Sequence, residues 1–304
     1  MQTDSGLSIT ADGRQVQLSN PEKRLFPESG ITKRDLAEYY LRVAPYMLPF
    51  VRERPLTLQR FPEGIDKDGF YQKQAPDYLP DWIRTVRLPK SDGHTDHMLI
   101  NDAATLIWLA NQAMITPHVG LHRADDRQHP DQLIFDLDPP DATPDAFADV
   151  RFAALRLSDA LTDLGLVPYV KTTGSKGLHV VVPLTRTVDF DEARAFAQEL
   201  SRRLAERHPE RLTTEQRIAK RGRRVYLDCL RNAYGQTAVA PYGVRARPNA
   251  PVATPLEWHE VNRAELGPQR YTVRNLFRRI GQKGACPWAD MPKHARALPA
   301  LPPR

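Results

Sequence analysis

Two segments in the N-terminal half have the apolar pattern of helices. Apolar side chains recur every three to four residues over 32–48, which predicts an amphipathic helix. Thr32 and Asp35 have the spacing of a capping box at its start. Pro45 would kink this helix or end it early. A nearly continuous apolar run over 104–114 predicts a second helix that is buried.

Further along the chain, short apolar runs alternate with amphipathic segments. We predict strands over residues 132–138, 167–172, 178–184 and 225–230, and helices over residues 143–164 and 190–207. Thr143 and Pro144 would supply the N-cap and the first residue of the earlier helix, and Gly165 would end it. Strands that alternate with helices indicate an α/β or α+β fold.

The composition is that of a folded chain and excludes several classes of protein. Of 304 residues, 41% are hydrophobic and 26% are charged, which is too apolar for a disordered chain. The sequence has no apolar run as long as a membrane span and no signal-peptide pattern at its start. Cys229 and Cys286 are the only cysteines, so a disulfide framework and a four-cysteine zinc site are excluded. These features predict a cytoplasmic protein.

Positive charge is concentrated in one segment. The 43 Lys and Arg residues exceed the 37 Asp and Glu residues, which gives a formal net charge of +6. Residues 217–224 hold five positive charges in eight positions, and Arg231, Arg245 and Arg247 follow. This segment is either a solvated helix end or an edge that binds nucleic-acid phosphates.

The strongest chemical signal is a pair of carboxylates at the end of a predicted strand. Asp136 and Asp138 follow the apolar residues 133–135, and residues i and i+2 of a strand point to the same face. Neighbouring carboxylates repel each other unless a cation lies between them, and divalent metals prefer oxygen ligands. Asp228 ends another predicted strand and would complete a set that could hold two metals for phosphoryl displacement. The alternative is a solvated exit from strand to loop.

A glycine-flanked loop follows the next predicted strand. Gly174 and Gly177 would let the backbone approach a ligand closely. Hydroxyl, ammonium and imidazole groups that could hold a triphosphate belong to Thr173, Ser175, Lys176 and His179. The loop is not a P-loop, because the Gly-x-x-x-x-Gly-Lys-Ser/Thr pattern is absent. An ordinary hairpin turn is the alternative interpretation.

Together these motifs resemble the polymerase domain of bacterial ligase D, in the archaeo-eukaryotic primase superfamily. In the family's order over residues 18–280, the matching motifs are Asn20-Pro-Glu-Lys23, Ile31-Thr-Lys33, Arg60-Phe-Pro-Glu-Gly64, Phe70-Tyr-Gln-Lys73, Trp108-Leu-Ala-Asn-Gln112, His118, Asp136-Leu-Asp138, Gly174-Ser-Lys-Gly-Leu-His179, Asp228 and Arg245-Ala-Arg247. The resemblance implies an α/β (α+β) primase-polymerase core, with an RRM-like antiparallel or mixed sheet and a flanking α/β lobe. We expect residues 1–286 to form this catalytic domain as two packed lobes, and the proline-rich residues 287–304 to form a tail or linker.

The resemblance also implies roles for the matched residues. Asp136, Asp138 and Asp228 would be the catalytic residues and would bind two Mn²⁺ or Mg²⁺ ions. The incoming nucleoside triphosphate would be held by Thr173, Ser175, Lys176, His179 and Arg245. Thr173, where the family often has Ser, is our candidate for the group that bonds a ribose 2′-hydroxyl, with His179 as the second choice. On the DNA side, the 5′-phosphate across a gap would be bound by Asn20, Lys23 and Lys33, template bases by Phe70 and Tyr71, and the primer by His118 and Arg221.

The function implied is DNA-dependent nucleotide transfer in double-strand break repair. Such an enzyme extends DNA 3′ ends and fills short gaps, preferably with ribonucleotides, during non-homologous end joining. Its partners would be DNA ends, gapped DNA with a 5′-phosphate, NTPs, Ku and a DNA ligase, and its place would be the nucleoid. The chain has no Lys-x-Asp-Gly nucleotidyl-lysine motif, so it is either a stand-alone polymerase or one domain of a larger ligase.

Two alternatives come from other functional classes. The Asp136-x-Asp138 pattern also occurs in haloacid-dehalogenase-type phosphatases, but those usually have Thr or Val where this chain has Pro140. A DNA-end-binding module without catalysis would need only the basic residues. The three carboxylates and the triphosphate loop favour the polymerase interpretation over both alternatives.

Overall fold

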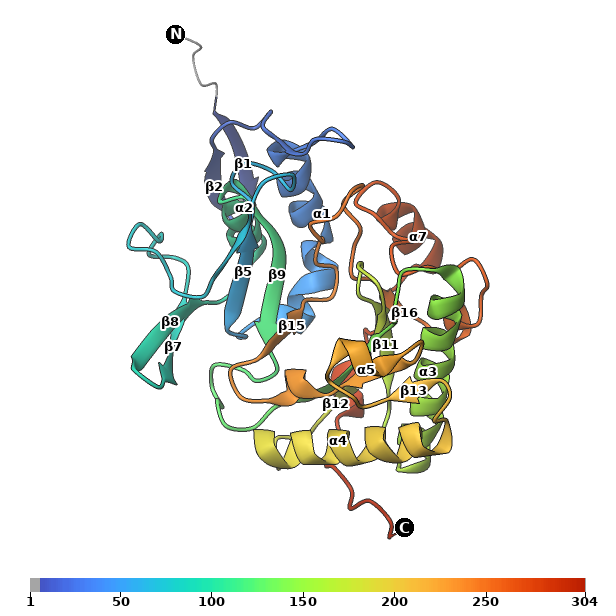
Figure 1. The fold of residues 1–304 in the computed structure, drawn as a ribbon. Helices are drawn as coiled ribbons and strands as arrows, with labels where there is room; N and C mark the ends of the chain where they lie inside the picture. Colours follow the sequence, from blue (N-terminus) through green and yellow to red (C-terminus); the bar gives the residue numbers. More distant parts are fainter. Residues whose placement is uncertain (1–5, 304) are drawn as a thin grey trace. The chain divides into compact units, whose positions relative to one another are not determined.

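The computed structural model describes residues 6–303, which divide into two compact units (Figure 1). Each unit is assembled from three separate stretches of the chain. Among the described residues, unit 1 comprises 6–125, Thr237–Ala253 and Tyr271–Arg279. Unit 2 comprises Asp126–Gln236, Thr254–Arg270 and 280–303. Within residues 6–303, no helix combines the length and the hydropathy needed to cross a bilayer.

Unit 1 contains a four-stranded antiparallel sheet in the order β15-β9-β5-β6. Its strands are β5 (Leu56–Arg60), β6 (Phe70–Gln72), β9 (Met114–Gly120) and β15 (Thr237–Val239). Helices α1 (Lys33–Val51) and α2 (Ala103–Asn111) pack against each other, and α2 also contacts β9. Three hairpins complete the unit: β1 (Leu7–Ala11) with β2 (Arg14–Leu18), β3 (Arg24–Phe26) with β4 (Ile31–Thr32), and β7 (Thr85–Lys90) with β8 (Gly93–Met98).

Helix α1 begins at the predicted capping box and continues past its prolines. Thr32 accepts a hydrogen bond from the Asp35 backbone N–H, and the Asp35 carboxylate accepts one from the Thr32 backbone N–H. Pro45 and Pro49 both lie inside the helix, which ends only at Val51. The predicted early end at Pro45 is therefore wrong. Residues on both sides of Pro45 are buried, so packing outweighs the hydrogen bond that the proline removes.

Unit 2 contains a six-stranded sheet in the order β13-β14-β10-β12-β11-β16. Its strands are β10 (Gln132–Asp138), β11 (Tyr169–Thr172), β12 (Leu178–Pro183), β13 (Leu212–Thr213), β14 (Val225–Asp228) and β16 (Pro255–Leu256). All neighbours are antiparallel except β13 and β14. The long helices α3 (Pro144–Asp163) and α4 (Phe190–Arg207) both contact β10. The short helices of unit 2 are α5 (Ile218–Arg221), η1 (Leu230–Asn232), α6 (Trp258–Val261) and η2 (Met291–His294). Helix α7 (Leu276–Lys283) is shared, because the boundary between the two units falls between residues 279 and 280.

The mixed α/β fold was predicted from the sequence, and the bounds of β10 and α4 match the prediction. Helix α3 begins after Thr143, whose hydroxyl accepts from the Ala146 backbone N–H at 3.3 Å. Gly165, just beyond the end of α3, has φ +73, a conformation that favours glycine.

The proline-rich segment that begins at residue 287 packs against unit 2. Trp288 is buried, and its indole N–H donates to the backbone oxygen of Val170 on β11 at 3.1 Å. Arg296 forms a parallel bridge with Leu184, directly after β12. The segment therefore continues the fold of unit 2 as far as Arg296, which differs from the tail or linker expected for residues 287–304.

Candidate active site

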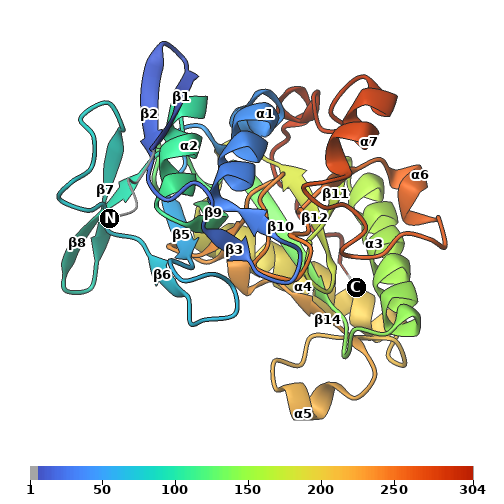
Figure 2. The same ribbon diagram turned by 90° about the horizontal axis from the view of Figure 1, so that it is seen from above.

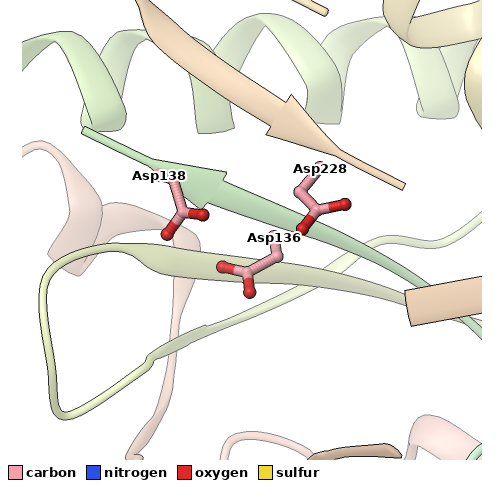
Figure 3. A group of neighbouring side chains, drawn as sticks. All are labelled: Asp136, Asp138 and Asp228. Carbon is pink, nitrogen blue, oxygen red and sulfur yellow. The ribbon is translucent and has the colours of Figure 1, made fainter. Parts of the chain in front are cut away.

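Three carboxylates come together where β10 and β14 lie side by side (Figure 3). Asp136 and Asp228 are register partners on the two antiparallel strands, and Asp138 is the partner of Tyr226. One carboxylate oxygen from each of the three acids lies within 4.8 Å of the other two. The period-2 geometry of β10 places Asp136 and Asp138 on one face, and the pairing with β14 adds Asp228. Such a group of oxygen ligands suits divalent cations.

The three acids have different electrostatic environments. Burial, together with the charges of Asp136 and Asp228, raises the pKa of Asp138 to about 7. Burial and the Asp136 charge also raise the pKa of Asp228, although the Leu230 backbone N–H donates to its Oδ1 at 2.7 Å. This mutual repulsion is what a bound divalent cation would relieve, so the cluster fits a metal.

Asp136 is held in its ionised form by positive groups. Burial opposes its ionisation, but nearby His179, Arg231 and Lys171 outweigh this effect and lower its pKa. His179 Nε2 lies 3.3 Å from Asp136 Oδ1, and Arg231 Nε lies 4.0 Å from Oδ2. Asp136 therefore stays a carboxylate, ready to accept a cation.

Four of these side chains form one row across the sheet. From β14 to β11, successive register partners are Asp228, Asp136, His179 and Lys171. His179 and Lys171 are only 3% and 1% exposed, so the row is largely removed from water. The sequence predicts that His179 holds the triphosphate, and in this row its Nε2 lies 3.3 Å from Oδ1 of Asp136. The sequence motifs give Lys171 no role, although its position opposite His179 in the β11–β12 pair could have indicated one, and they include Arg231 only among the basic residues that could bind nucleic-acid phosphates.

The glycine loop that follows β11 is shaped by Thr173. Its hydroxyl donates to the Gly177 carbonyl at 3.0 Å and accepts from the Ser175 and Gly177 backbone N–H groups, each at 3.2 Å. A hydroxyl has one donor and two acceptor sites, so these bonds use its full capacity. The geometry therefore favours a loop-shaping role for Thr173 over the predicted contact with a ribose. Lys176, at the loop tip, is exposed.

Gly177 explains why this loop lies close to the carboxylates. A Cβ atom at this position would lie 1.9 Å from the carbonyl oxygen of Leu137, the residue between Asp136 and Asp138. A side chain is therefore incompatible with the close approach of the loop to β10.

Arg221 braces the basic segment rather than projecting from it. Its guanidinium donates to the backbone oxygens of Glu215 and Gln216 at 3.0 and 2.8 Å, and it stacks 3.8 Å over the ring of Tyr226. Tyr226 is the strand partner of Asp138, so the brace fastens the segment to the strand that carries Asp228. Figure 2 shows α5 at the tip of the projecting loop. The cations that line a groove on this loop are Arg217, Lys220 and Arg224.

In unit 1, the structure brings together the three residues predicted to bind a 5′-phosphate. Asn20 has a left-handed backbone (φ +48), and its carbonyl accepts from the Lys23 N–H at 3.0 Å. The Lys23 carbonyl accepts from the Lys33 N–H at 2.9 Å. The Lys33 ammonium donates to the Ser19 carbonyl at 2.7 Å, while the Lys23 ammonium pairs with exposed Glu63 at 2.9 Å.

The two aromatic residues predicted to stack on the template lie on edge strand β6 and are exposed. As neighbours in a strand, Phe70 and Tyr71 point to opposite faces. The Arg60 guanidinium lies 5.3 Å from the Phe70 ring, and the Tyr71 ring lies 5.8 Å from the ring of His118 on β9. The pair therefore offers two separate stacking surfaces, one beside Arg60 and one beside His118.

Arg245 belongs to unit 1, whereas the other residues predicted to hold the triphosphate belong to unit 2. Its backbone N–H donates to the Pro251 carbonyl at 2.8 Å, and its carbonyl accepts from the Arg247 N–H at 2.8 Å. This short turn fixes the backbone of the Arg-Ala-Arg motif within unit 1.

Comparison with known proteins identifies the family. Residues 32–288 match the model of the LigD primase-polymerase domain. The chain belongs to this family. The structure is similar to that of the "Polymerase Domain from Mycobacterium tuberculosis Ligase D in complex with DNA", with a TM-score of 0.86 and 31% identity. That match covers 92% of this chain and 99% of the other, so the primase-polymerase fold extends over nearly all of both.

Curated relatives are LigD proteins of bacterial end joining. The "Bifunctional non-homologous end joining protein LigD" of Bacillus subtilis is 34% identical over 286 residues, which cover 94% of this chain and 45% of that protein. The "Multifunctional non-homologous end joining protein LigD" of Pseudomonas aeruginosa is 34% identical over 277 residues, which cover 90% of this chain and 32% of that protein. The chain thus spans less than half the length of either LigD relative.

Proposed function

We propose that this chain is a DNA-dependent nucleotidyltransferase that extends DNA 3′ ends and fills short gaps in non-homologous end joining. The observation that carries this proposal is the cluster of Asp136, Asp138 and Asp228 in a member of the LigD primase-polymerase family. The names of the relatives supply the repair process, and the name of the solved M. tuberculosis domain supplies DNA as the ligand. Family membership favours this activity over the phosphatase and end-binding alternatives.

The three carboxylates would hold two divalent ions, Mn²⁺ or Mg²⁺. Bound there, the ions would neutralise charge on the reacting phosphates and favour ionisation of the attacking 3′-hydroxyl. His179 would orient Asp136 through the 3.3 Å contact between its Nε2 and Asp136 Oδ1. Arg231 adds positive charge beside the same carboxylate.

The incoming nucleoside triphosphate would lie against the glycine loop. Thr173 fixes the loop, and the groups of unit 2 that we assign to the phosphates are Ser175, Lys176 and His179. The Lys176 side chain is exposed and can move towards a ligand, whereas His179 is buried and held in place. Lys176 is therefore the cation of the loop best able to bind a phosphate. We retain the expectation that ribonucleotides are preferred, which derives from the family resemblance.

Unit 1 would bind the DNA beyond the reacting end. Asn20, Lys23 and Lys33 would bind the 5′-phosphate across the gap, and the exposed rings of Phe70 and Tyr71 would stack on unpaired template bases. His118, beside Tyr71, and the braced loop of Arg221 would contact the DNA as well. A DNA ligase would then seal the filled gap, and Ku would hold the ends.

A single extension assay tests this proposal. Gapped DNA with a labelled primer, Mn²⁺ and rNTPs should give templated extension with the wild-type protein and none with Asp228→Ala. Phosphate release without extension would favour the phosphatase. If wild type and variant both bind the DNA, seen as its retarded migration on a native gel, and neither extends the primer, the result would favour a binding module.

A further inference from the structure

Asn111, the last residue of α2, connects two parts of the predicted 5′-phosphate site. Its Oδ1 accepts hydrogen bonds from the backbone N–H and the hydroxyl of Ser19, at 3.0 and 3.3 Å. Its Nδ2 donates to the Gln17 carbonyl at 3.0 Å. The side-chain amide therefore fastens the chain at 17–19, directly before Asn20, to the end of a buried helix.

The same Oδ1 also meets the Lys33 ammonium. Lys33 Nζ lies 3.3 Å from Asn111 Oδ1 and 3.4 Å from the Ser19 hydroxyl, and it makes a shorter bond of 2.7 Å to the Ser19 carbonyl. Lys33 is only 6% exposed, so this ammonium has a fixed position instead of the freedom of a surface lysine. The 2.7 Å bond can anchor it while a phosphate oxygen takes over the longer contacts.

The chemistry at residue 111 requires an amide. An amide oxygen accepts from the ammonium without adding charge, and its NH₂ group supplies the bond to Gln17. A carboxylate of the same shape could not donate to Gln17. It would also pair with Lys33 and cancel the positive charge that attracts a phosphate.

We propose that Asn111 is a positioning residue that determines the specificity of this protein for a 5′-phosphate. It aligns the Lys33 ammonium with the segment 17–20 without adding a charge beside it. This inference rests on the proposed function, in which Lys33 binds the 5′-phosphate. It adds a residue from the Trp108-Leu-Ala-Asn-Gln112 motif, for which the sequence analysis gave no role.

The test compares two gapped DNAs that differ only in a 5′-phosphate or a 5′-hydroxyl. The affinity of each is measured by fluorescence anisotropy for the 304-residue chain as wild type, Asn111→Asp and Lys33→Ala. We expect the wild type to prefer the phosphate, and Asn111→Asp to lose about tenfold or more of that preference while its affinity for the 5′-hydroxyl gap stays the same. Asn111→Ala, which removes the alignment without adding charge, should lose less of it than Asn111→Asp.

Gln112→Glu is the matched control. It makes the same amide-to-acid change one residue away, where the side chain accepts from the Tyr78 hydroxyl at 3.3 Å, and it should keep the phosphate preference. If Asn111→Asp prefers the 5′-phosphate gap as strongly as the wild type does, the inference is overturned. An equal loss of affinity for both DNAs in Asn111→Asp would also overturn it, because that result would indicate a folding defect. A wild type without preference, unchanged by Lys33→Ala, would instead overturn the proposed 5′-phosphate site itself.

Discussion

The side-chain amide of Asn232 pairs with the backbone of Ile134 as a neighbouring strand would. Its Oδ1 accepts from the Ile134 N–H at 2.8 Å, and its Nδ2 donates to the Ile134 carbonyl at 2.7 Å and to the Cys229 carbonyl at 3.0 Å. Strand β14 ends at Asp228, so β10 would otherwise lack a partner on this side, two residues before Asp136. Asn232 thereby supports the strand that carries two of the three carboxylates.

Replacing Asn232 with Ala should therefore lower the free energy of unfolding by about 3 kcal/mol. The variant leaves a buried N–H and two buried carbonyls without their side-chain partner. Urea denaturation followed by circular dichroism measures the change. Asn262→Ala, at an exposed position after α6, should change stability by less than about 0.5 kcal/mol. Equal stability of the two variants would contradict the structural role of Asn232.

Divalent cations should stabilise the wild type through the carboxylate cluster. Mn²⁺ should raise the melting temperature of the wild type, because a ligand that binds only the folded state shifts the equilibrium towards it. Asp138→Asn and Asp228→Asn should lose this response and lower kcat for extension by more than about 100-fold. Asp145→Asn, at an exposed position of α3, should behave as wild type. A full Mn²⁺ response in Asp228→Asn would show that the metal binds elsewhere.

A methyl group at position 177 should disturb the cluster without touching a carboxylate. Gly177→Ala would place its Cβ 1.9 Å from the Leu137 carbonyl oxygen, so the loop or β10 must move. We expect a stability loss of about 1–3 kcal/mol, together with a weaker Mn²⁺ shift of the melting temperature. Gly267→Ala is the control, because a Cβ there meets no atom within 4 Å and should be tolerated. Wild-type stability and Mn²⁺ response in Gly177→Ala would contradict the close approach.

Thr173→Val should weaken the use of all nucleotides rather than the choice between them. The valine side chain keeps the shape of threonine but removes three hydrogen bonds inside the loop. We expect kcat/KM for rNTPs and dNTPs to fall by similar factors, so that their ratio stays within about twofold of wild type. A selective loss for rNTPs would instead assign the Thr173 hydroxyl to the ribose.

The two cysteines should differ in their reactivity over a wide pH range. Burial raises the pKa of the Cys229 thiol to about 12, against the opposing effect of the Ser201 hydroxyl 3.0 Å away. The reactive form is the thiolate, so Cys229 should stay unreactive below about pH 11 in the folded protein. Titration with a thiol reagent at pH 8 should detect only the half-buried Cys286, and both thiols in denaturant. Two fast-reacting thiols in the native protein would contradict this assignment.

The part of the site that the sequence predicted most directly lies on β10, a strand with clear periodicity. Strand β10 has an apolar run followed by two acids in period 2, so the shared face of Asp136 and Asp138 could be inferred locally. Adding Asp228 to the same cluster required only the assumption that β14 lies beside β10. The family resemblance supplied the roles that the pattern alone left open between a metal site and a solvated turn.

Other features depend on contacts between distant parts of the chain. Strands β6 and β15 have three residues each, too few to show a period, and β15 pairs with β9, which lies more than 110 residues earlier in the chain. The Arg221 guanidinium packs over the ring of Tyr226 because of the path that an exposed loop takes. The charge pattern of the sequence does not specify that path. The same is true of Asn111, whose partners Gln17 and Ser19 lie more than 90 residues earlier.

The interleaving of the two units along the chain has a consequence for synthesis on the ribosome. Strand β9 is complete at Gly120, but its neighbour β15 follows only after the whole stretch Asp126–Gln236 of unit 2. At an elongation rate of about 5–20 residues/s this delay lasts roughly 5–20 s. During that time one edge of β9 lacks its strand and can pair with another nascent chain. A gene fragment that stops at residue 125 would keep this edge of β9 open permanently, so we expect its product to aggregate. Because each unit is built from three stretches of the chain, neither unit can be exchanged between proteins as one continuous piece.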